Sequence, residues 1–280
     1  SSINKYLDSI KNGASSSIYL QVTGTPQAIF LQTMASGWHP YFTHYFEPGD
    51  GYLGGDFFFP QNKTADCIAF LEKTTRPERS VAIHHLAVSG QIFASGGKVC
   101  NCLIHPSVRQ AVHGRYEKAM QGELSWCLDH IDDEFRAELQ NAYDELHPEK
   151  SSKADFEAVF AATKNLLENH AVKVLVMNGK HDVDSSEYSS GSNIVIGGNT
   201  LGRGVTFPAL HTIYYTRTSK KPQADTMWQH SRMFGYDRDP GMMKVYIDEP
   251  LYKLFSDINA TNNSIIAQIQ RGTENIKIYY

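Results

Sequence analysis

The sequence contains no hydrophobic run near the length that crosses a bilayer, and its first residues lack the apolar centre of a signal peptide. A membrane-spanning helix needs about 20 consecutive apolar residues, and a secretory signal needs an apolar stretch behind a basic start. We therefore expect a cytoplasmic protein without membrane segments. With 41% apolar and 20% charged residues among its 280, the chain can bury one sizeable core or two smaller ones.

Metal-ligating patterns are also missing. The twelve histidines form no H-E-x-x-H set, and the four cysteines lack the C-x-x-C spacing typical of zinc sites. Asp182, Asp184 and Glu187 share a serine-rich loop without the Glu-x-Lys pairing common in metal-dependent nucleases. We predict no metal site, and we expect the cysteines to be buried reduced thiols. They are Cys67, Cys100, Cys102 and Cys127.

The phosphate-binding loop of NTPases, Gly-x-x-x-x-Gly-Lys-Ser/Thr, is absent as well. This loop holds the β- and γ-phosphates of ATP. We therefore expect no ATP hydrolysis by these residues alone.

Apolar strand-like runs alternate with amphipathic helical stretches along the chain. The predicted strands cover residues 17–22, 99–105, 172–177, 193–196, 211–216 and 243–247. The predicted helices cover residues 3–11, 77–93, 108–126, 132–146, 153–169 and 223–234, and a last helix begins at Pro250. This alternation predicts an α/β fold with a parallel sheet and helices on both faces. Residues 38–59 are rich in aromatic residues and glycine, and they predict an irregular loop whose aromatics pack on the domain or stack on bases.

Two segments indicate a phosphate site. Residues 197–206 are glycine-rich and follow the apolar run Ile194–Ile196, whereas residues 229–238 carry two arginines close to a turn glycine. Glycines let main-chain N–H groups approach oxyanions, and guanidinium groups give multidentate contacts to phosphoryl oxygens.

The charge distribution agrees with this interpretation although the net charge is only −4. Residues 199–238 hold six basic and two acidic residues, a local charge of +4, whereas residues 123–157 hold eleven acidic and three basic residues, a local charge of −8. A phosphate backbone is attracted to the basic sector. The acidic stretch is expected to face away from DNA.

With these segments, the chain resembles the Z1 domain family, prokaryotic proteins described as candidate endonucleases whose core is similar to a superfamily-two helicase or translocase. The resemblance rests on four segments in helicase order. They are Thr23-Gly24-Thr25-Pro26 as motif III, Cys102–Ser107 as motif IV, Arg203-Gly204 as motif V, and Gln229, Arg232 and Arg238 as motif VI.

The resemblance implies a fragment of a larger protein. Residues 1–76 correspond to the end of a first RecA-like lobe, and residues 77–280 to a second lobe with a helical insertion over about 108–169. The family also carries an acidic Mg²⁺-binding box before motif III, which residues 1–22 lack. The run Ile131–Glu134 imitates that box, but its place in a helical stretch favours an acidic first turn. ATP and Mg²⁺ are therefore expected to bind mainly to the missing first lobe.

Site roles follow from the same resemblance. The expected catalytic residues are Arg232, Arg238 and Gln229, and the expected nucleotide contacts are Arg203, Gly204 and Thr206. The expected nucleic-acid contacts are Ser107, Asn199, Thr200, Lys220 and Lys221. Thr23 and Thr25 are expected to couple the two lobes.

A structural interpretation stands beside several of these roles. Arg232 could pair with Asp225 or Asp237, Thr206 and Ser107 could cap helices, and a tight turn before Pro26 could explain motif III. The resemblance favours an ATP-dependent DNA helicase or translocase of a prokaryotic restriction or defence system. It would act on single- or double-stranded DNA with a nuclease partner or domain. A non-catalytic RecA-like module that binds DNA or a partner, and a nuclease domain, are the alternatives.

Overall fold

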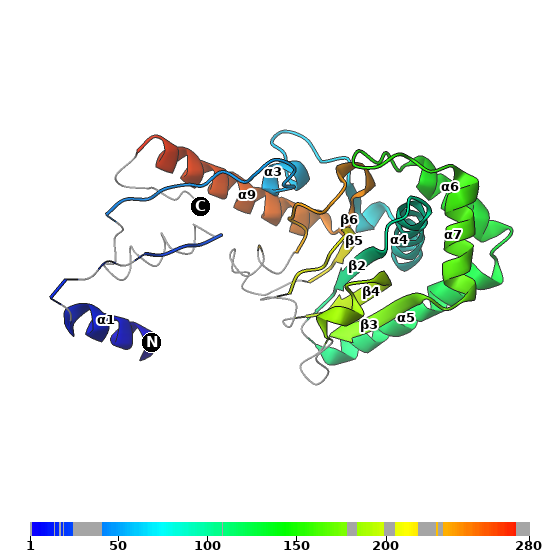
Figure 1. Ribbon diagram of the computed structural model, residues 1–280, viewed down its shortest axis with the longest axis horizontal. Coiled ribbons are helices and arrows are strands. Elements are labelled where there is room, and N and C mark those ends of the chain that lie inside the picture. The colour runs from blue at the N-terminus through cyan, green and yellow to red at the C-terminus, as the bar shows by residue number, and fades with distance from the viewer. Residues whose placement is uncertain are drawn as a thin grey trace.

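Figure 1 shows a computed structural model of the chain. It describes residues 2–13, 15, 16, 18, 20–24, 41–107, 109–177, 184–198, 205–217, 228 and 232–272.

The centre of the molecule is a six-stranded sheet in which all strands are parallel. In chain order, the strands are β1 (Ile68–Phe70), β2 (Val99–His105), β3 (Val172–Met177), β4 (Gly191–Gly197), β5 (Leu210–Tyr215) and β6 (Lys244–Ile247). Their order across the sheet is β1-β6-β5-β2-β4-β3. The chain therefore crosses over β2 when it passes from β4 to β5. The predicted α/β fold with a RecA-like parallel sheet is confirmed.

Side chains alternate between the two faces of the sheet, as the pleat of a strand requires. On β2, Cys102 and Ile104 share a hydrophobic cluster with Val81 and Tyr116 from the helices on one face. Leu103 between them belongs to the cluster on the other face. Both faces are apolar because helices cover both, which is typical of parallel sheets.

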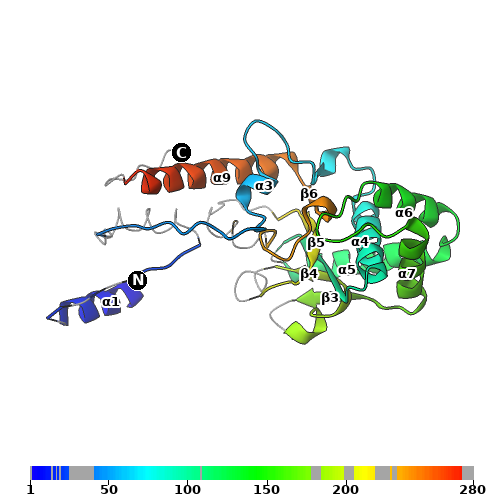
Figure 2. The same cartoon turned by 45° about the horizontal axis from the view of Figure 1, so that its top comes forward.

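Four helices lie on the first face, in two layers. The helices α4 (Pro77–Ala94) and α5 (Gln110–Asp129) pack on the strands, and α6 (Glu134–Asp144) and α7 (Phe156–Glu168) pack against α4. Figure 2 shows α4 between the sheet and the outer pair. Pro77 starts α4 at a position where its missing N–H costs no hydrogen bond. The three predicted helices between 108 and 169 are thus α5, α6 and α7.

The acidic run at 131–134 forms a helix start, as predicted. Asp133 is the N-cap of α6 and its carboxylate accepts a hydrogen bond from the N–H of Glu134, at 2.7 Å. Asp132 forms an ion pair with Lys164 of α7, at 2.8 Å. These carboxylates stabilise the outer helical layer.

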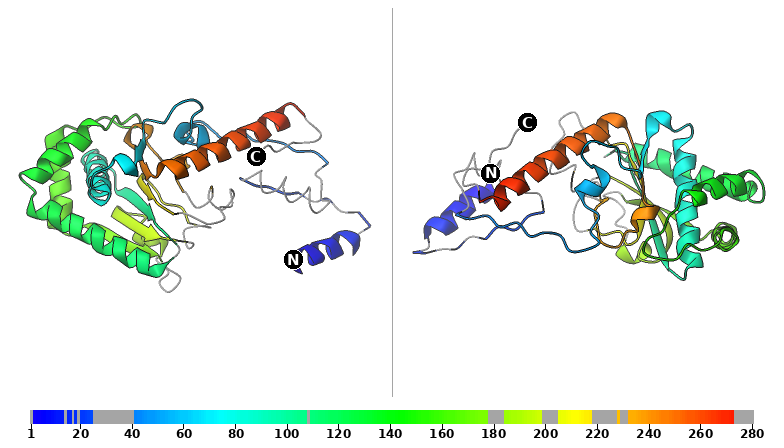
Figure 3. Two further views of the ribbon diagram at one scale, coloured as in Figure 1. Left: turned by 180° about the vertical axis from the view of Figure 1, so that it is seen from behind. Right: turned by 90° about the horizontal axis from the view of Figure 1, so that it is seen from above.

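On the opposite face, the first turns of α9 (Glu249–Gln270) and the four-residue helix α3 (Gly55–Phe58) belong to the hydrophobic cluster of the sheet, and the rest of α9 runs beyond the sheet in both views of Figure 3. Phe255 of α9 stacks on Phe59, with ring centroids 5.3 Å apart. Asn259 donates hydrogen bonds to Asp56 and to the main-chain oxygen of Phe59. Packing is therefore the role of the aromatics at 57–59, whereas Tyr41, Phe42 and Phe46 are exposed.

Short 3-10 turns and a separate helix complete the described structure. The turns are Leu71–Lys73, Ser185–Glu187 and Pro240–Met242, and the helix is α1 (Ser2–Gly13), which lies apart from the sheet in Figures 1 and 2. The four cysteines are free and buried, as predicted. None of the described helices has the length and apolar character to cross a membrane.

Two predicted elements differ from the structure. Residues 18 and 20–22 are not a strand, and their apolar side chains are exposed, because the segment lies outside the sheet that would bury them. The predicted helix 223–234 does not reach its expected end, since residues 232–234 are not helical and Arg232 has a φ of 55°.

The predicted boundary between two lobes near residue 76 stays a prediction. Ile68–Phe70, on the N-terminal side of that boundary, pair with Val245–Ile247 of β6 and form one edge of the sheet. The six-stranded sheet therefore includes residues from both sides of the predicted boundary.

Candidate functional site

Three neighbouring strands lead into the predicted nucleic-acid contacts. Ser107 comes two residues after β2, Arg217 two residues after β5, and β4 ends at Gly197 just before the glycine-rich segment. Because β5, β2 and β4 are adjacent and parallel, their carboxyl ends share one edge, where open α/β sheets bind ligands. The other four candidates lie outside the described residues. They are Asn199, Thr200, Lys220 and Lys221.

His105, Tyr215 and Arg217 meet at this edge. The rings of His105 and Tyr215 lie edge to face with centroids 5.0 Å apart, and Arg217 Nη1 is 3.2 Å from His105 Nε2. A guanidinium only donates hydrogen bonds, so His105 accepts this one through Nε2. Burial raises the pKa of Tyr215 to about 12, so the phenol carries no charge here. Arg217 therefore supplies the positive charge of this trio.

Ser107 lies in a turn that precedes α5. Its hydroxyl accepts a hydrogen bond from the N–H of Arg109 at 3.2 Å, and its main-chain oxygen lies 2.6 Å from His113 Nε2. The helix itself begins at Gln110, with Arg109 in the N-cap position. The predicted capping role of Ser107 is therefore wrong, because the helix starts later than the sequence suggests. Its role in nucleic-acid binding stays a prediction.

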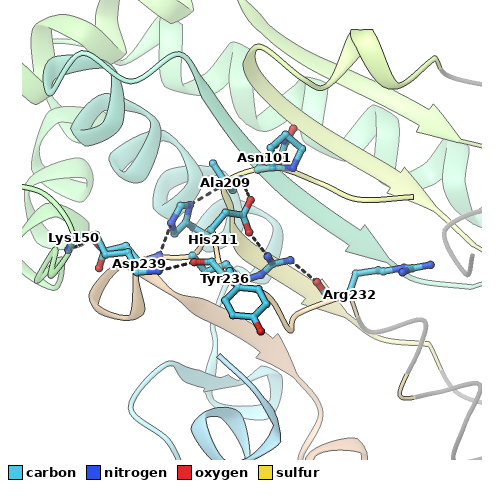
Figure 4. Close-up of polar contacts among 10 residues, drawn as sticks. Asn101, Lys150, Ala209, His211, Arg232, Tyr236 and Asp239 are labelled. Carbon is cyan, nitrogen blue, oxygen red and sulfur yellow. Dashed lines mark hydrogen bonds and ion pairs between the residues drawn. The ribbon is translucent and has the colours of Figure 1, made fainter. Parts of the chain in front are cut away.

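Arg232 stands in the left-handed backbone region, with a φ of 55°. This conformation is unfavourable for a residue with a long side chain and persists only where surrounding contacts impose it. The contact here is a hydrogen bond from Arg238 Nη2 to the main-chain oxygen of Arg232, at 2.8 Å. Figure 4 shows the Arg232 side chain directed away from His211 and Asp239. Partial burial lowers the pKa of Arg232, but a guanidinium stays charged in proteins.

Arg238 is almost fully buried, with 4% of its surface exposed. It forms an ion pair with Asp237, whose other carboxylate oxygen accepts a hydrogen bond from the N–H of Ala209 at 2.7 Å. A Cβ atom at Gly235 would overlap the guanidinium of Arg238, so a larger residue there would displace this group. These contacts anchor the 235–238 turn to the start of β5. A catalytic role for Arg238 stays a prediction.

Two further candidates, Thr206 and Thr23, lie in the described part of the chain. Thr206 is exposed and lies four residues before β5, with no helix following it, so the interpretation of Thr206 as a helix cap is wrong. Thr23 is exposed and lies outside any strand. The remaining candidates fall outside the described residues. They are Thr25, Arg203, Gly204 and Gln229.

Asp184 and Glu187, two of the acidic residues that a nuclease centre would use, form hydrogen bonds that stabilise a local turn. Asp184 accepts a hydrogen bond from the N–H of Ser186, and Glu187 accepts one from the N–H of Asp184, which together form a capping box. The hydrogen bonds at Ser186 lower the pKa of Asp184. Within the described part of the chain, no group of three metal-ligating side chains is present. Asp182 lies outside the described residues.

The sequence analysis did not predict two buried polar contacts near the anchor, those of His211 and of the pair Asn193 and Asn101. His211 accepts a hydrogen bond through Nε2 from the N–H of Asp239 at 3.0 Å and contacts the main-chain oxygen of Ala209 through Nδ1 at 3.0 Å. Asn193 donates to Asn101 at 3.0 Å between β4 and β2. Asparagines inside otherwise apolar strands were the available signal, because buried amides need hydrogen-bond partners.

The comparison with protein families agrees with the fold. The model of a family described as the Z1 domain matches residues 79–277. This region begins in α4 and includes β2 to β6, α9 and the whole Arg232–Asp239 segment. No curated protein matches the chain.

Proposed function

Since this chain belongs to the Z1 domain family, we propose that it is the second RecA-like lobe of an ATP-dependent DNA translocase or helicase in a prokaryotic restriction or defence system. The observation that carries the proposal is the anchored backbone of Arg232. Arg238, Asp237 and Gly235 fix the loop, and the Arg232 side chain is directed away from those contacts.

A guanidinium held in this way is suited to a phosphate. It offers several N–H donors in a fixed geometry, and its charge is always present. Because the backbone is already fixed, little free energy is spent on ordering this loop when an anionic group binds. Arginine fingers in phosphoryl-transfer enzymes accelerate the reaction by about 10³- to 10⁵-fold, so Arg232 is the proposed finger.

ATP and Mg²⁺ fit this lobe only in part. Arg232 and the Thr206 segment offer donors for phosphate oxygens, but the described residues contain no acidic cluster that could ligate Mg²⁺. The sequence contains no P-loop. Another lobe would therefore supply the phosphate loop and the metal ligands, and this chain alone is expected to show no ATP turnover above background.

The carboxyl edge of β5, β2 and β4 is the proposed DNA track. Arg217 supplies charge there, and the segments that follow these strands carry Asn199, Thr200, Lys220 and Lys221. Contacts of this kind bind phosphates and carry no sequence information. Closure of the two lobes on ATP would bring Arg232 to the γ-phosphate, and hydrolysis would release the clamp so that the protein steps along DNA. A nuclease partner or domain would make the cuts.

The test uses the full-length protein that contains both lobes. Arg232→Ala is expected to lower DNA-stimulated ATP turnover by at least about 10²-fold and to leave ATP affinity within a few-fold, since the group acts mainly on the transition state. Arg271→Ala, at the exposed end of α9, is the matched control and should keep full turnover. Wild-type turnover in Arg232→Ala would assign that residue to structure.

The main alternative is a RecA-like module that binds DNA or a partner without hydrolysing ATP. It shares the sheet and the basic sector, so DNA binding alone does not separate the two functions. A full-length protein that binds DNA but neither binds nor hydrolyses ATP would favour the alternative.

A further inference from the structure

The outer helical layer is tied directly to the turn that follows Arg232. Asp239 is buried, with 3% of its surface exposed. Its carboxylate accepts hydrogen bonds from the N–H groups of Glu149 at 2.9 Å, Lys150 at 2.8 Å and Gly241 at 3.1 Å. Glu149 and Lys150 belong to the connection between α6 and α7. One buried side chain therefore binds two segments that are 89 and 90 residues apart in sequence.

Further contacts join the same two segments. The N–H of His147 donates to the main-chain oxygen of Gly241 at 2.9 Å, and a Cβ atom at Gly241 would lie 1.7 Å from the main-chain oxygen of His147. Lys150 Nζ donates to the main-chain oxygen of Tyr236 at 2.7 Å. Met242 belongs to the hydrophobic cluster of α4, α6 and α7. The turn is thus packed into the helical layer as well as hydrogen-bonded to it.

A short path leads from this junction to Arg232. Asp239 follows Arg238, and Arg238 holds the main-chain oxygen of Arg232. The N–H of Asp239 also donates to His211 on β5, so the residue is fixed from the sheet side and from the helical side. A shift of the α6–α7 connection would move Asp239, and with it the anchor that imposes the unfavourable φ of Arg232.

We propose that Asp239 is a positioning residue through which the α6–α7 layer sets the orientation of Arg232. The inference rests on the proposed function, in which Arg232 reaches a phosphate. The layer then acts as a regulatory input: any contact that displaces the α6–α7 connection changes turnover through the same hydrogen bonds.

The test is a double-mutant cycle in the full-length protein, with turnover measured per folded, ATP-binding molecule. Asp239→Asn keeps the shape of the side chain but replaces one of the two acceptor oxygens with an NH2 group, which donates where a main-chain N–H group needs an acceptor. It should lower turnover by about 10-fold and leave the KM for ATP within about 2-fold. In the Arg232→Ala background the same substitution should change turnover by less than about 2-fold, because residues that act as one unit are not additive.

Two controls separate positioning from general stability. Asp144→Asn makes the same chemical change on an exposed residue of α6 and should leave turnover unchanged. Hydrogen exchange on the 280-residue chain should show that Asp239→Asn speeds exchange at one or more of the amides of Glu149, Lys150 and Gly241, because one of the two acceptor oxygens is lost.

The outcomes are distinct. Wild-type turnover in Asp239→Asn, or an equal loss in both backgrounds, would overturn the inference while Arg232→Ala still supports the proposed function. Wild-type turnover in Arg232→Ala would refute the proposed function and this inference together. Unchanged exchange at the three amides would show that Asp239 does not hold the α6–α7 connection.

Discussion

The guanidinium of Arg238 lies 2.8 Å from the main-chain oxygen of Arg232, so one motif arginine supports the backbone of the other. Arg238 is buried and paired with Asp237, whereas Arg232 is half-buried and its side chain is directed away from the anchor. The two arginines of this segment therefore differ in physical role, although the sequence analysis named both as catalytic candidates.

The anchoring role of Arg238 predicts that its alanine substitution destabilises the chain, whereas the same substitution of an exposed arginine does not. Arg238→Ala should lower the free energy of unfolding by about 2–3 kcal/mol, because it removes a buried charged donor and its ion pair. Arg271→Ala, which removes an exposed guanidinium, should stay within about 0.5 kcal/mol of the wild type. Urea unfolding of the chain measures both. Equal stabilities would contradict the anchoring role of Arg238.

The contact between α4 and α7 gives a second prediction. A Cβ atom at Gly90 would lie 2.3 Å from Thr163 Oγ1 and 2.7 Å from the main-chain oxygen of Val159. Gly90→Ala should therefore destabilise the chain by about 1–3 kcal/mol through overpacking. Gly122→Ala is the control: nothing lies within 4 Å of its Cβ position on α5, and a helical Gly→Ala change should stabilise by about 0.5–1 kcal/mol.

If both substitutions shifted the urea midpoint in the same direction, the close approach of α4 and α7 would be wrong. The two variants separate the packing effect from helix propensity. Both glycines lie in helices, but only Gly90 has close neighbours at its Cβ position.

Five of the six strands, β2 to β6, were predictable because they are largely apolar runs bounded by polar residues, whereas the three-residue strand β1 (Ile68–Phe70) was not predicted. Ile194–Ile196 is such a run, and its alternate residues serve the two faces. The run at 17–22 has a similar composition. A strand forms only where neighbouring strands pair with such a run and bury it, and residues 18 and 20–22 are exposed. Periodicity reports which face could be buried, and tertiary contacts decide whether it is.

The site was less predictable because its determinants are distant in sequence. The resemblance to helicase motifs identified Arg232 and Arg238, but the left-handed φ of Arg232 depends on Arg238 and Gly235 together. The role of Asp239 depends on residues about 90 positions away. No local pattern encodes such a contact.

Buried histidines predict a specific loss of stability in acid. Burial lowers the pKa of His85 to about 3, and its ring contacts Ser192 Oγ at 2.9 Å and Cys100 Sγ at 3.8 Å. The unfolded chain binds a proton near pH 6.5 and the folded chain does not until about pH 3. Stability is therefore highest above pH 6.5 and falls as the pH falls toward 3, by about 2 kcal/mol for this group between pH 6.5 and 5.

The variant His85→Gln keeps a hydrogen-bonding side chain and removes the titration. Its unfolding free energy should depend less steeply on pH between 6.5 and 5, by about one proton. A slope in His85→Gln equal to that of the wild type would show that His85 binds its proton equally in both states.

The proposed DNA track predicts a salt dependence that follows the basic sector. The triple variant Asn199→Ala, Lys220→Ala and Lys221→Ala should weaken binding similarly for unrelated DNA sequences, since phosphate contacts carry no sequence information. It should also reduce the slope of log affinity against log salt concentration by about 2, because each lysine that neutralises a phosphate releases counterions.

The matched control neutralises three acids of the −8 stretch, Glu138, Asp144 and Glu145, which lie in or beside α6 in the outer helical layer. Because α6 packs against α4 and Glu145 pairs with Lys244 at the amino end of β6, away from the carboxyl edge, these acids should be remote from DNA, and their removal should leave the slope nearly unchanged. A larger change in the acidic variant than in the basic one would place the DNA on the outer layer, even with the helicase-like fold intact.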